Sequence, residues 1–388
     1  MSQASTTALI VAGEASGDRY GAALAAEVRR RYPVEWFGIG SDQMEAAGVE
    51  LVTHAREMAV VGIFEVVRHL PRIYGIYRRL LAEVDQRRPR FAVLIDFPDF
   101  NLRLARQLHH RGIPVVYFVA PQLWAWRPGR VVQLRRYVPK LLCIFPFEEE
   151  WFRSRGVNVE YVGHPLLDAA RPTLGREEFF ARHKLDPDVP TICLLPGSRK
   201  QEVQRHLPLM LAAAAQLLRD RELQFTLVRA NTVEPELIRD LAARAPGVPL
   251  TVVAENPYNA LASSELAVIS SGTATVEALL LRVPMVVVYR VAASTWRLGR
   301  PLVRTPHYSM VNLLAGERLV PELIQHDFTP ARVAAEVSRL LDDATERRRI
   351  QEVLGSVAQR LGPPGAIERA SRALAAAVGL DTENQLRG

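Results

Sequence analysis

The sequence predicts an α/β protein of two doubly wound domains, each with a parallel sheet between layers of helices. Short apolar runs alternate with longer helical patterns, as is typical of such sheets; the runs are "ALIVAG", "FAVLID", "PVVYFV", "LLCIFPF", "TICLLPG", "FTLVRA", "ELAVISS" and "PMVVVY". The chain has 388 residues, which is too many for one ordinary core. Residues 163–190, rich in proline and charge, interrupt the alternation before a new strand begins at Thr191.

These features predict an N-terminal domain at residues 1–170, a second domain at 185–345 and C-terminal helices at 346–388. The C-terminal helices are amphipathic and interrupted by "GPPG", so they could cap either domain or bridge both. Ligands of doubly wound folds bind beyond the carboxyl ends of the strands, and we therefore expect a cleft that both domains face.

The composition is that of a globular protein with excess positive charge: 48% of residues are hydrophobic, 23% are charged and the net charge is +7. This charge favours an anionic partner, whether a phosphorylated ligand, anionic lipid or nucleic acid. Cys143 and Cys193 lie in apolar runs and the nine histidines lack metal-ligand spacing, so we expect no metal and no cofactor. No secretion signal and no apolar stretch of about 18 residues is found, which predicts a cytoplasmic protein.

Candidate ligand-binding residues follow the first strand, in the loop "AGEASGD". Ser16 and Gly17 are small enough for a ligand to approach closely. The glycines of this loop do not match the dinucleotide fingerprint, which disfavours an NAD site. In the alternative interpretation no ligand binds, and Ser16 or Asp18 caps a helix that begins near Tyr20.

A candidate acid or base follows a later strand, in "LIDFPDFNLRLA". Asp96 comes directly after the buried strand, and Asp99 and Asn101 precede the next helix. Carboxylates at the end of a parallel strand are well placed for proton abstraction or for binding sugar hydroxyls. Asp99 could instead cap the helix. A charge at Asp96 would lie near the edge of the core, so we favour a functional acid or base there.

Tryptophan and arginine follow the strand "VVYFV", in "VAPQLWAWRPGRV". Gln122 and Trp124 come first, with Trp126, Arg127 and Arg130 after them. Indole rings stack on the apolar faces of sugars, so this segment could be a platform for sugar or lipid. Equally, the tryptophans could only pack the loop against its domain.

The second domain contains two turns suited to phosphate. In "LLPGSRK" a strand turns through Gly197 into a helix, so backbone N–H groups near Ser198 can meet an anion beside the guanidinium of Arg199. In "SSGTATVEAL" a helix opens after a glycine turn, and a glutamate one turn into it could bind ribose hydroxyls; these residues are Gly272, Thr273, Ala274, Thr275 and Glu277. A capping box would need Ser or Thr three residues before Glu277, where alanine stands. Together the turns predict a site for a nucleotide diphosphate.

Residues 58–82 combine apolar side chains with arginines. Met58, Val60, Val61, Ile63, Phe64, Val66 and Val67 stand in one stretch with Arg68, Arg72, Arg78 and Arg79. Such a stretch is either a helix that lies on anionic lipid or a core helix with solvated charges.

These segments, in this order, resemble the lipid-A-disaccharide synthase family. The matching segments are "VAGEASGD", "GIGSDQMEAAG", "MAVVGIFEV", "DFPDFN", "PQLWAWRPGRV", "FPFE", "GHPLLD", "LLPGSR", "SSGTATVEAL", "PMVVVYR" and "NLLAGERLVPELIQ". The resemblance implies the GT-B architecture, in which two Rossmann-like domains face a cleft and the last helices cross back to the amino-terminal domain.

The resemblance also implies an inverting transfer from UDP-2,3-diacylglucosamine to 2,3-diacylglucosamine 1-phosphate, giving a tetra-acyl disaccharide 1-phosphate and UDP. Asp96 matches the family's essential acid, Arg199 the arginine of "PGSR" and Asn312 the asparagine of "NLLAG". The implied partners are the UDP-sugar donor, the acylated acceptor and anionic lipid on the inner face of the cell membrane, without nucleic acid. Assembly as a homodimer stays open.

Two other functions would share some of these features. Another GT-B enzyme, such as a UDP-N-acetylglucosamine 2-epimerase or a different sugar transferase, would also bind a diphosphate, but it gives no reason for the stretch 58–82. A non-enzymatic protein that binds membranes or nucleic acid would explain the charge but not the two phosphate turns, and no nucleic-acid module is recognisable.

Overall fold

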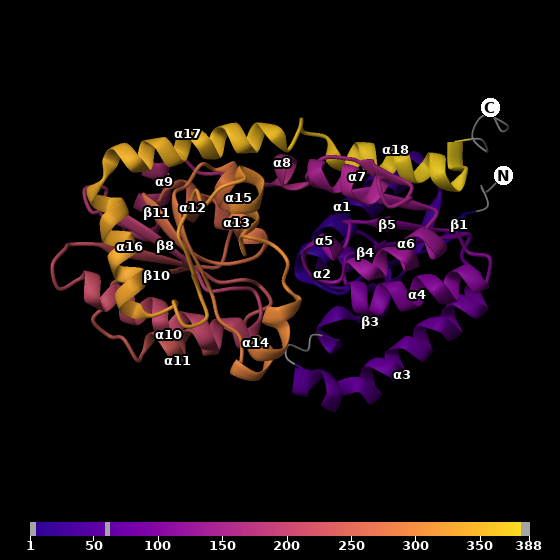
Figure 1. Ribbon diagram of the computed structural model, residues 1–388, viewed down its shortest axis with the longest axis horizontal. Coiled ribbons are helices and arrows are strands. Elements are labelled where there is room, and N and C mark those ends of the chain that lie inside the picture. The colour runs from indigo at the N-terminus through magenta and orange to yellow at the C-terminus, as the bar shows by residue number, and fades with distance from the viewer. Residues whose placement is uncertain (1–4, 59–62, 382–388) are drawn as a thin grey trace. The chain divides into compact units, whose positions relative to one another are not determined.

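The fold is described from a computed structural model, which covers residues 5–58 and 63–381 and, for residues 63–70, the backbone alone. The described chain forms two compact units (Figure 1). Unit 1 contains the residues up to Leu167, Leu302–Arg304 and those from Leu361 on, whereas unit 2 contains Asp168–Pro301 and Thr305–Arg360. The first division falls inside the proline-rich passage 163–190, and most of that passage folds with unit 2.

Unit 1 is built around a seven-stranded sheet in the order β3-β2-β1-β4-β5-β6-β7, with every described pair parallel. Its strands are β1 (Thr6–Ala12), β2 (Val34–Gly40), β3 (Glu50–His54), β4 (Phe91–Ile95), β5 (Val115–Phe118), β6 (Lys140–Cys143) and β7 (Val159–Tyr161). Its helices are α1 (Ala15–Arg31), α2 (Asp42–Ala46), α3 (Ile63–Arg87), α4 (Pro98–His110), α5 (Leu123–Trp126), α6 (Val131–Tyr137), α7 (Pro146–Arg153) and α18 (Ala366–Val378), and α8 (Leu166–Ala169) spans the division.

Helices cover both faces of this sheet, which explains the continuous apolar runs of its central strands. Strand β4 is buried along its whole length, as expected for a parallel strand between two helical layers. One face packs on α3, α4 and α6, where Leu80, Leu104 and Leu134 join the core. The other face carries α1 and α18, which contact each other (Figure 1).

Unit 2 repeats the arrangement with a six-stranded parallel sheet in the order β10-β9-β8-β11-β12-β13. Its strands are β8 (Thr191–Leu195), β9 (Gln224–Val228), β10 (Leu250–Val253), β11 (Leu266–Ser270), β12 (Met285–Tyr289) and β13 (Glu322–Ile324). Its helices are α9 (Arg176–His183), α10 (Lys200–Leu217), α11 (Pro235–Ala242), α12 (Pro257–Ala262), α13 (Thr273–Leu280), α14 (Ala293–Gly299), α15 (Met310–Ala315), α16 (Pro330–Asp342) and α17 (Ala344–Arg360). Helices α10, α11 and α16 lie together, and α13, α15 and α17 form another group (Figure 1).

The two C-terminal helices belong to different units. Helix α17 packs on α13, α15 and α16 in unit 2, and α18 packs on α1, β5 and β6 in unit 1. The sequence places the start of the crossing segment at residue 346, whereas in the structure unit 2 continues to Arg360. The break follows from "GPPG", because both glycines adopt positive φ and the two prolines cannot continue a helix.

The stretch 58–82 is partly covered by the structure. Val60 and Val61, and the side chains of Ile63, Phe64, Val66, Val67 and Arg68, lie outside what it describes. The sequence grouped Met58 with the stretch that could lie on lipid. That prediction is wrong for Met58, because its side chain is buried in the core of unit 1. Further along α3, Arg72, Tyr74, Arg78 and Arg79 are exposed.

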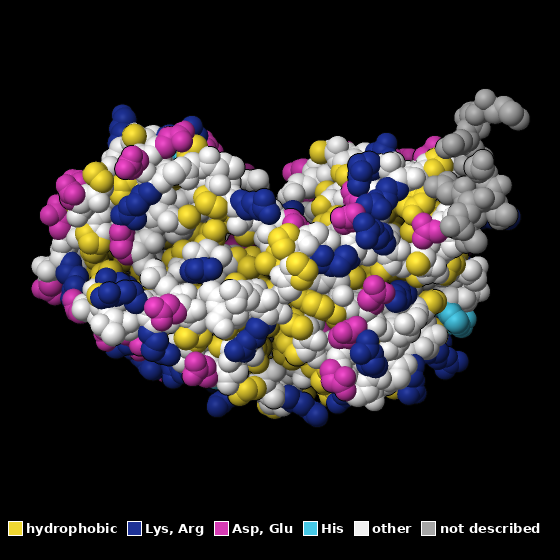
Figure 2. All heavy atoms as spheres, turned by 90° about the horizontal axis from the view of Figure 1, so that it is seen from above, with side chains coloured by type: hydrophobic (Ala, Val, Ile, Leu, Met, Phe, Trp, Pro, Cys, Tyr) yellow, Lys and Arg dark blue, Asp and Glu magenta, His cyan; other side chains and the backbone are white. Residues whose placement is uncertain are grey.

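The hydropathy of the helices and the distribution of surface charge both bear on which partners the protein can bind. Among the described residues, no helix combines the length and apolar character needed to cross a bilayer. Figure 2 shows basic side chains interleaved with acidic ones on the face it presents, so the positive charge does not form one strip there.

Candidate functional site

The predicted residues lie where the strand order of each sheet reverses. The chain builds one side of the unit 1 sheet from β1 and then the other from β4, and in unit 2 the same reversal separates β8 from β11. Loops after such neighbouring strands separate at the carboxyl edge and leave room for a ligand. Residues 13–17 and Asp96 therefore share one such point, and Arg199 and Thr273 share the other.

Asp96 is held in an uncommon backbone conformation directly after β4. Its φ is 44°, in the left-handed region that few residues other than glycine, Asn and Asp adopt. Its N–H donates to Phe118 O at 3.1 Å, and its carbonyl accepts from Asn101 Nδ2 at 2.8 Å and from the hydroxyl of Tyr117. Three hydrogen bonds thus fix the main chain of Asp96, and the residue as a whole is half-buried.

Asn101 supports this conformation from the first turn of α4. Its side chain is fully buried, and Nδ2 donates to the carbonyls of both Ile95 and Asp96, at 3.1 and 2.8 Å. Asn101, predicted to bind substrate, therefore positions the backbone of Asp96. Tyr117 beside it is also buried, and burial together with the charge of Asp96 raises the pKa of its hydroxyl well above the ordinary value.

The loop after β1 approaches Phe97, the residue after Asp96, closely through Gly13. A Cβ at this position would lie 2.5 Å from the ring of Phe97, which stacks on Phe100 at 5.6 Å. Helix α1 begins at Ala15 and not near Tyr20, so Ser16 and Gly17 lie in its first turn.

The capping alternative for this loop is wrong for Asp18. Its buried carboxylate accepts from the N–H groups of Ser41, Gln43 and Met44, at 2.5, 3.1 and 3.3 Å. It therefore stabilises the start of α2, and the N-cap residue of α1, Glu14, makes no side-chain capping bond.

Asp99 lies in the first turn of α4 and pairs with the loop after β5. Its carboxylate is 3.2 Å from Arg127 Nη1 and 2.5 Å from Arg130 Nη2. The pairs are partly exposed, so each contributes little to stability but restricts where the two arginines lie. Gln122, at the start of the same loop, is exposed.

Trp124 is held by a residue that the sequence analysis did not select. Its Nε1 donates to Glu148 Oε1 at 3.1 Å, and its ring meets Phe147 edge to face with centroids 5.0 Å apart. Glu148 is almost completely buried, and burial raises the pKa of its carboxyl to about 8 against the lowering effect of the Trp124 and Phe145 N–H groups. The segment "FPFE" offered one signal, because it places an acid in the first turn of a helix after a buried strand.

In unit 2 the turn between β8 and α10 is braced by Glu202. Its Oε2 accepts from the N–H groups of Ser198 and Arg199, at 3.2 and 3.4 Å, and its Oε1 lies 2.8 Å from Arg199 Nη1. Gly197 is required here, because its φ is 123° and a Cβ would lie 2.6 Å from the carboxylate. The side chain of Arg199 is 38% exposed.

His206 is a second residue that sequence reasoning missed, because nothing in a helical pattern distinguishes it from a core position. It is fully buried; Nδ1 lies 2.8 Å from Pro196 O, and Nε2 lies 3.0 Å from Arg290 N and 3.1 Å from Arg290 O. Burial lowers the pKa of its imidazole, so the neutral form joins the turn after β8 to the loop after β12.

The second turn opens directly into α13. The helix begins at Thr273 as predicted, and its N-cap residue, Gly272, has φ 155° and no side chain to occupy the free N–H groups. Thr275 is buried and donates its hydroxyl to Gly272 O at 2.8 Å, and Glu277 accepts from the Tyr258 hydroxyl at 3.3 Å. Ala274, in the first turn of α13, is a small and partly exposed residue.

The comparisons with known proteins agree over nearly the whole chain. The family model described as lipid-A-disaccharide synthetase matches residues 8–377. The chain belongs to this family. A lipid-A-disaccharide synthase of Koribacter versatilis (strain Ellin345) is 47% identical over 372 residues, which cover 94% of this chain and 97% of the relative. That of Solibacter usitatus (strain Ellin6076) is 45% identical over 368 residues, covering 94% and 96%.

Solved structures confirm the predicted fold class. The calicheamicin glycosyltransferase CalG4 is 18% identical with a TM-score of 0.60, covering 97% of this chain and 99% of its own. MurG of Acinetobacter baumannii is 16% identical with a TM-score of 0.56, covering 95% and 99%. A putative UDP-N-acetylglucosamine 2-epimerase of Listeria monocytogenes, 12% identical with a TM-score of 0.66 over 96% of each chain, shows that epimerases share the fold.

Family membership also confirms the predicted activity. This member of the lipid-A-disaccharide synthetase family is a glycosyltransferase of lipid A biosynthesis that uses a UDP-sugar. The epimerase and non-enzymatic alternatives are thereby set aside. Within the described part of the chain, no cluster of three His, Cys, Asp or Glu side chains could hold a metal ion.

Asn312 is placed differently from the other candidates, because its side chain is wholly engaged in the protein. Nδ2 donates to Val320 O at 3.0 Å and to Glu322 Oε1 at 2.9 Å, and Oδ1 accepts from Val320 N at 3.0 Å. Glu322 also accepts from Ser309 Oγ at 2.6 Å. Asn312 therefore fixes the course of the chain around α15.

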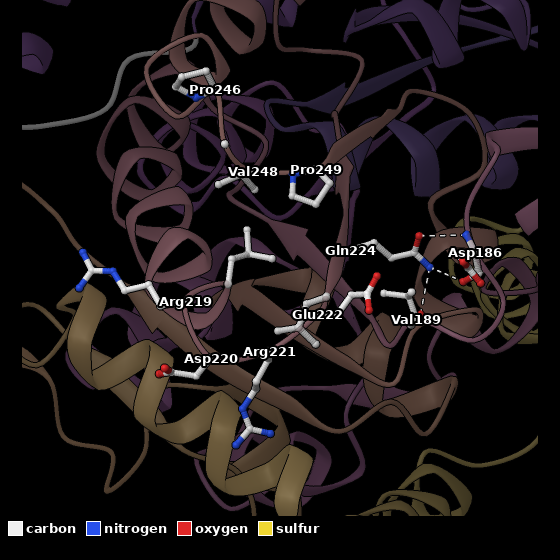
Figure 3. Close-up of a pocket in the computed structure, with 13 residues that line it drawn as sticks. Asp186, Val189, Arg219, Asp220, Arg221, Glu222, Gln224, Pro246, Val248 and Pro249 are labelled. Atoms are coloured by element: carbon white, nitrogen blue, oxygen red, sulfur yellow. Dashed lines mark hydrogen bonds between the residues drawn. The ribbon is translucent and has the colours of Figure 1, made fainter.

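Another depression of unit 2 lies away from the predicted residues. It is lined by residues at or just before the starts of β8, β9 and β10, among them Val189, Arg221, Gln224 and Pro249 (Figure 3). The amino ends of parallel strands are opposite the edge where α10 and α13 begin, so this depression is no part of the candidate site.

Proposed function

We propose that the chain transfers 2,3-diacylglucosamine from its UDP ester to the 6-hydroxyl of 2,3-diacylglucosamine 1-phosphate, with inversion at the anomeric carbon. The products are the β-1,6-linked tetra-acyl disaccharide 1-phosphate and UDP. Membership of the lipid-A-disaccharide synthetase family carries this proposal.

Asp96 is the general base in this proposal. An inverting transfer needs a group that takes the proton of the acceptor hydroxyl as it attacks the anomeric carbon. Asp96 suits this role by its position, because it follows β4 at the carboxyl edge of the sheet and its backbone is held by Phe118, Asn101 and Tyr117. A base held in one conformation needs no rearrangement when the reaction occurs.

Unit 2 binds the donor. Negative charge develops on the UDP diphosphate as the glycosidic bond breaks, and Arg199 with the N–H groups at the start of α13 would stabilise it. Ser198, Gly272, Thr273, Ala274 and Thr275 supply the turns, and Glu277 would accept from ribose hydroxyls. The left-handed Gly197 and the Glu202 brace support this, because they fix the turn that carries Arg199.

Unit 1 binds the acylated acceptor and the membrane surface. Ser16, Gly17, Asp99, Asn101, Gln122 and Trp124 border or support the edge of the sheet that carries Asp96. The exposed Arg72, Arg78 and Arg79 of α3 favour contact with anionic lipid, where acyl chains reside. This supports a peripheral protein on the inner face of the cell membrane.

Incubation with UDP-2,3-diacylglucosamine and 2,3-diacylglucosamine 1-phosphate tests the reaction. We expect stoichiometric UDP and tetra-acyl disaccharide 1-phosphate, with no product when either substrate is omitted. UDP-N-acetylglucosamine in place of the acylated donor is the control. Epimerised sugar from that control, or failure to form disaccharide from the acylated pair, would contradict the proposal.

A further inference from the structure

We propose that Glu148 is a positioning residue of the acceptor site, whose carboxylate fixes the indole of Trp124 so that this ring receives the acceptor sugar. The inference rests on the proposed function, since it assigns Trp124 to the acceptor.

The first observation is that both oxygens of a buried carboxylate are used. Oε1 accepts from the Trp124 indole at 3.1 Å and Oε2 accepts from Phe145 N at 3.3 Å, while only 1% of Glu148 is exposed. The bond to Phe145 N alone would be an ordinary cap at the start of α7. The bond to Trp124 reaches 24 residues back in the chain and is not needed for capping.

The second observation is that the indole is held at two points from one turn of helix. Phe147 packs edge to face against it with centroids 5.0 Å apart, and Glu148 holds its N–H. An aromatic ring restrained in this way loses little entropy when a sugar stacks on it. Neighbouring Trp126 is less suited, because the guanidinium of Arg127 lies over its ring at 4.4 Å.

The third observation is the order of the strands. Asp96 follows β4, Trp124 comes after β5, and Glu148 comes after β6, and these strands are neighbours in the sheet. Since the strands are parallel, all three residues belong to its carboxyl edge. A sugar stacked on Trp124 would therefore lie at the edge that carries the proposed base.

Kinetics of Glu148→Met test this inference, since methionine keeps the length of the side chain but accepts no strong hydrogen bond. We expect the KM for the acceptor to rise about tenfold, as for loss of one buried hydrogen bond, with kcat changed less than about threefold. UDP affinity should stay at the parent value. Glu150→Gln, an exposed acid on the same helix, is the matched control and should match the parent.

A double-variant cycle separates positioning from helix capping. In a Trp124→Phe background, which lacks the indole N–H, Glu148→Met should raise the acceptor KM no further. Trp126→Phe serves as the control background, in which the full rise should persist. A merely structural Glu148 would raise the KM equally in all backgrounds. Should Glu148→Met not fold, Glu148→Leu, which also accepts no hydrogen bond, takes its place in the cycle.

Tryptophan emission gives a readout independent of turnover. The emission due to Trp124 is the spectrum of a protein minus the spectrum of the same protein with Trp124→Phe. Relative to the parent, this difference spectrum should shift in Glu148→Met and not in Glu150→Gln. Unchanged emission, a parental acceptor KM in Glu148→Met, or additive effects in the cycle would overturn the inference. An inactive parent protein would instead overturn the proposed reaction, while emission would still report on the contact.

Discussion

Asp96 has a strained backbone conformation that hydrogen bonds to its main chain stabilise. A left-handed φ costs a residue with a Cβ about 1 kcal/mol or more, and it persists only where the surroundings enforce it. Here the N–H and carbonyl of Asp96 are held by Phe118, Asn101 and Tyr117. Because these hydrogen bonds involve only the main chain of Asp96, we expect a substitution of its side chain to keep the backbone conformation.

Asp96→Asn should therefore remove turnover without unfolding the enzyme. Asparagine also tolerates the left-handed region, so the backbone should keep its bonds. We expect kcat to fall by about 10² to 10⁴ because the base is lost, with UDP affinity near the parent value. Asp85→Asn, which alters an exposed acid paired with Arg111, is the control. A folded Asp96→Asn enzyme with parental turnover would show that Asp96 is not the base.

Arg199→Ala should weaken donor binding and slow the reaction together. The guanidinium charge is present in both the ground state and the transition state, and one lost hydrogen bond to a charged group corresponds to about 10- to 100-fold in affinity. Calorimetric titration with UDP measures this. Arg199→Lys should lie between parent and Ala because it keeps charge but loses the fork. The exposed neighbour Lys200→Ala is the control, and unchanged UDP affinity in Arg199→Ala would leave the turn a purely structural role.

At the scale of elements, the site of unit 2 depends on loops that are tied to one another. Strand β8 ends at Leu195 and β12 at Tyr289, and His206 of α10 joins the chain after each. The neutral imidazole with its proton on Nδ1 can donate to Pro196 O and accept from Arg290 N at the same time.

This arrangement predicts an acid-sensitive unit 2. Burial holds the pKa of His206 below its unfolded value of 6.5, so the unfolded chain takes up the proton first as pH falls. Its contribution to stability should be complete above about pH 6.5 and decline below it. The hydrogen bonds with the Pro196 and Arg290 backbone, and then the charge of Glu202, oppose this lowering of the pKa, whereas the charge of Arg205 adds to it. We expect the parent to lose more thermal stability between pH 8 and pH 5 than His206→Gln does, measured by scanning calorimetry. Equal losses would contradict this role.

At the scale of the whole molecule, the positions of the arginines matter more than the net charge of +7. Many of the described arginines pair with acids on their own helix, as Arg153 does with Glu149 and Arg349 with Glu346. Arg78 and Arg79 of α3 are exposed beside Tyr74, whose side chain is 62% exposed. An exposed aromatic ring among cations suits the interface of an anionic membrane.

We predict reversible binding to anionic vesicles through α3. Changing Phe64, Arg72, Arg78 and Arg79 to Ser should release the protein, because each basic residue near an anionic surface contributes about 1 kcal/mol and the apolar side chain adds to it. Co-sedimentation at low and high salt measures the effect, and short-chain soluble substrates should still react.

The matched control for vesicle binding removes three exposed arginines of unit 2, Arg219, Arg244 and Arg348, by changing each to Ser. It alters the net charge by the same amount and should sediment like the parent. If the fourfold α3 variant stays folded and sediments equally well, a different surface makes the contact.

The sequence by itself determined the two parallel sheets, the turns that carry Arg199 and Thr273, and the position of Asp96 at a strand end. These features are local: apolar runs, glycine turns and helix starts lie within a few residues of one another and are governed by backbone geometry and hydrophobic periodicity. The order of the segments that resemble the family then indicated the family, which the comparisons confirm.

Only the tertiary structure decided which polar side chains hold backbone groups of the protein. Asn312, Asn101 and Asp18 stand in motifs as prominent as that of Asp96, yet their side chains hold backbone groups. Conversely, Glu148 becomes significant only because Trp124, distant in the chain, donates to it in a buried place. Burial and the identity of a hydrogen-bond partner depend on residues that meet through folding, and no local pattern in the sequence encodes them.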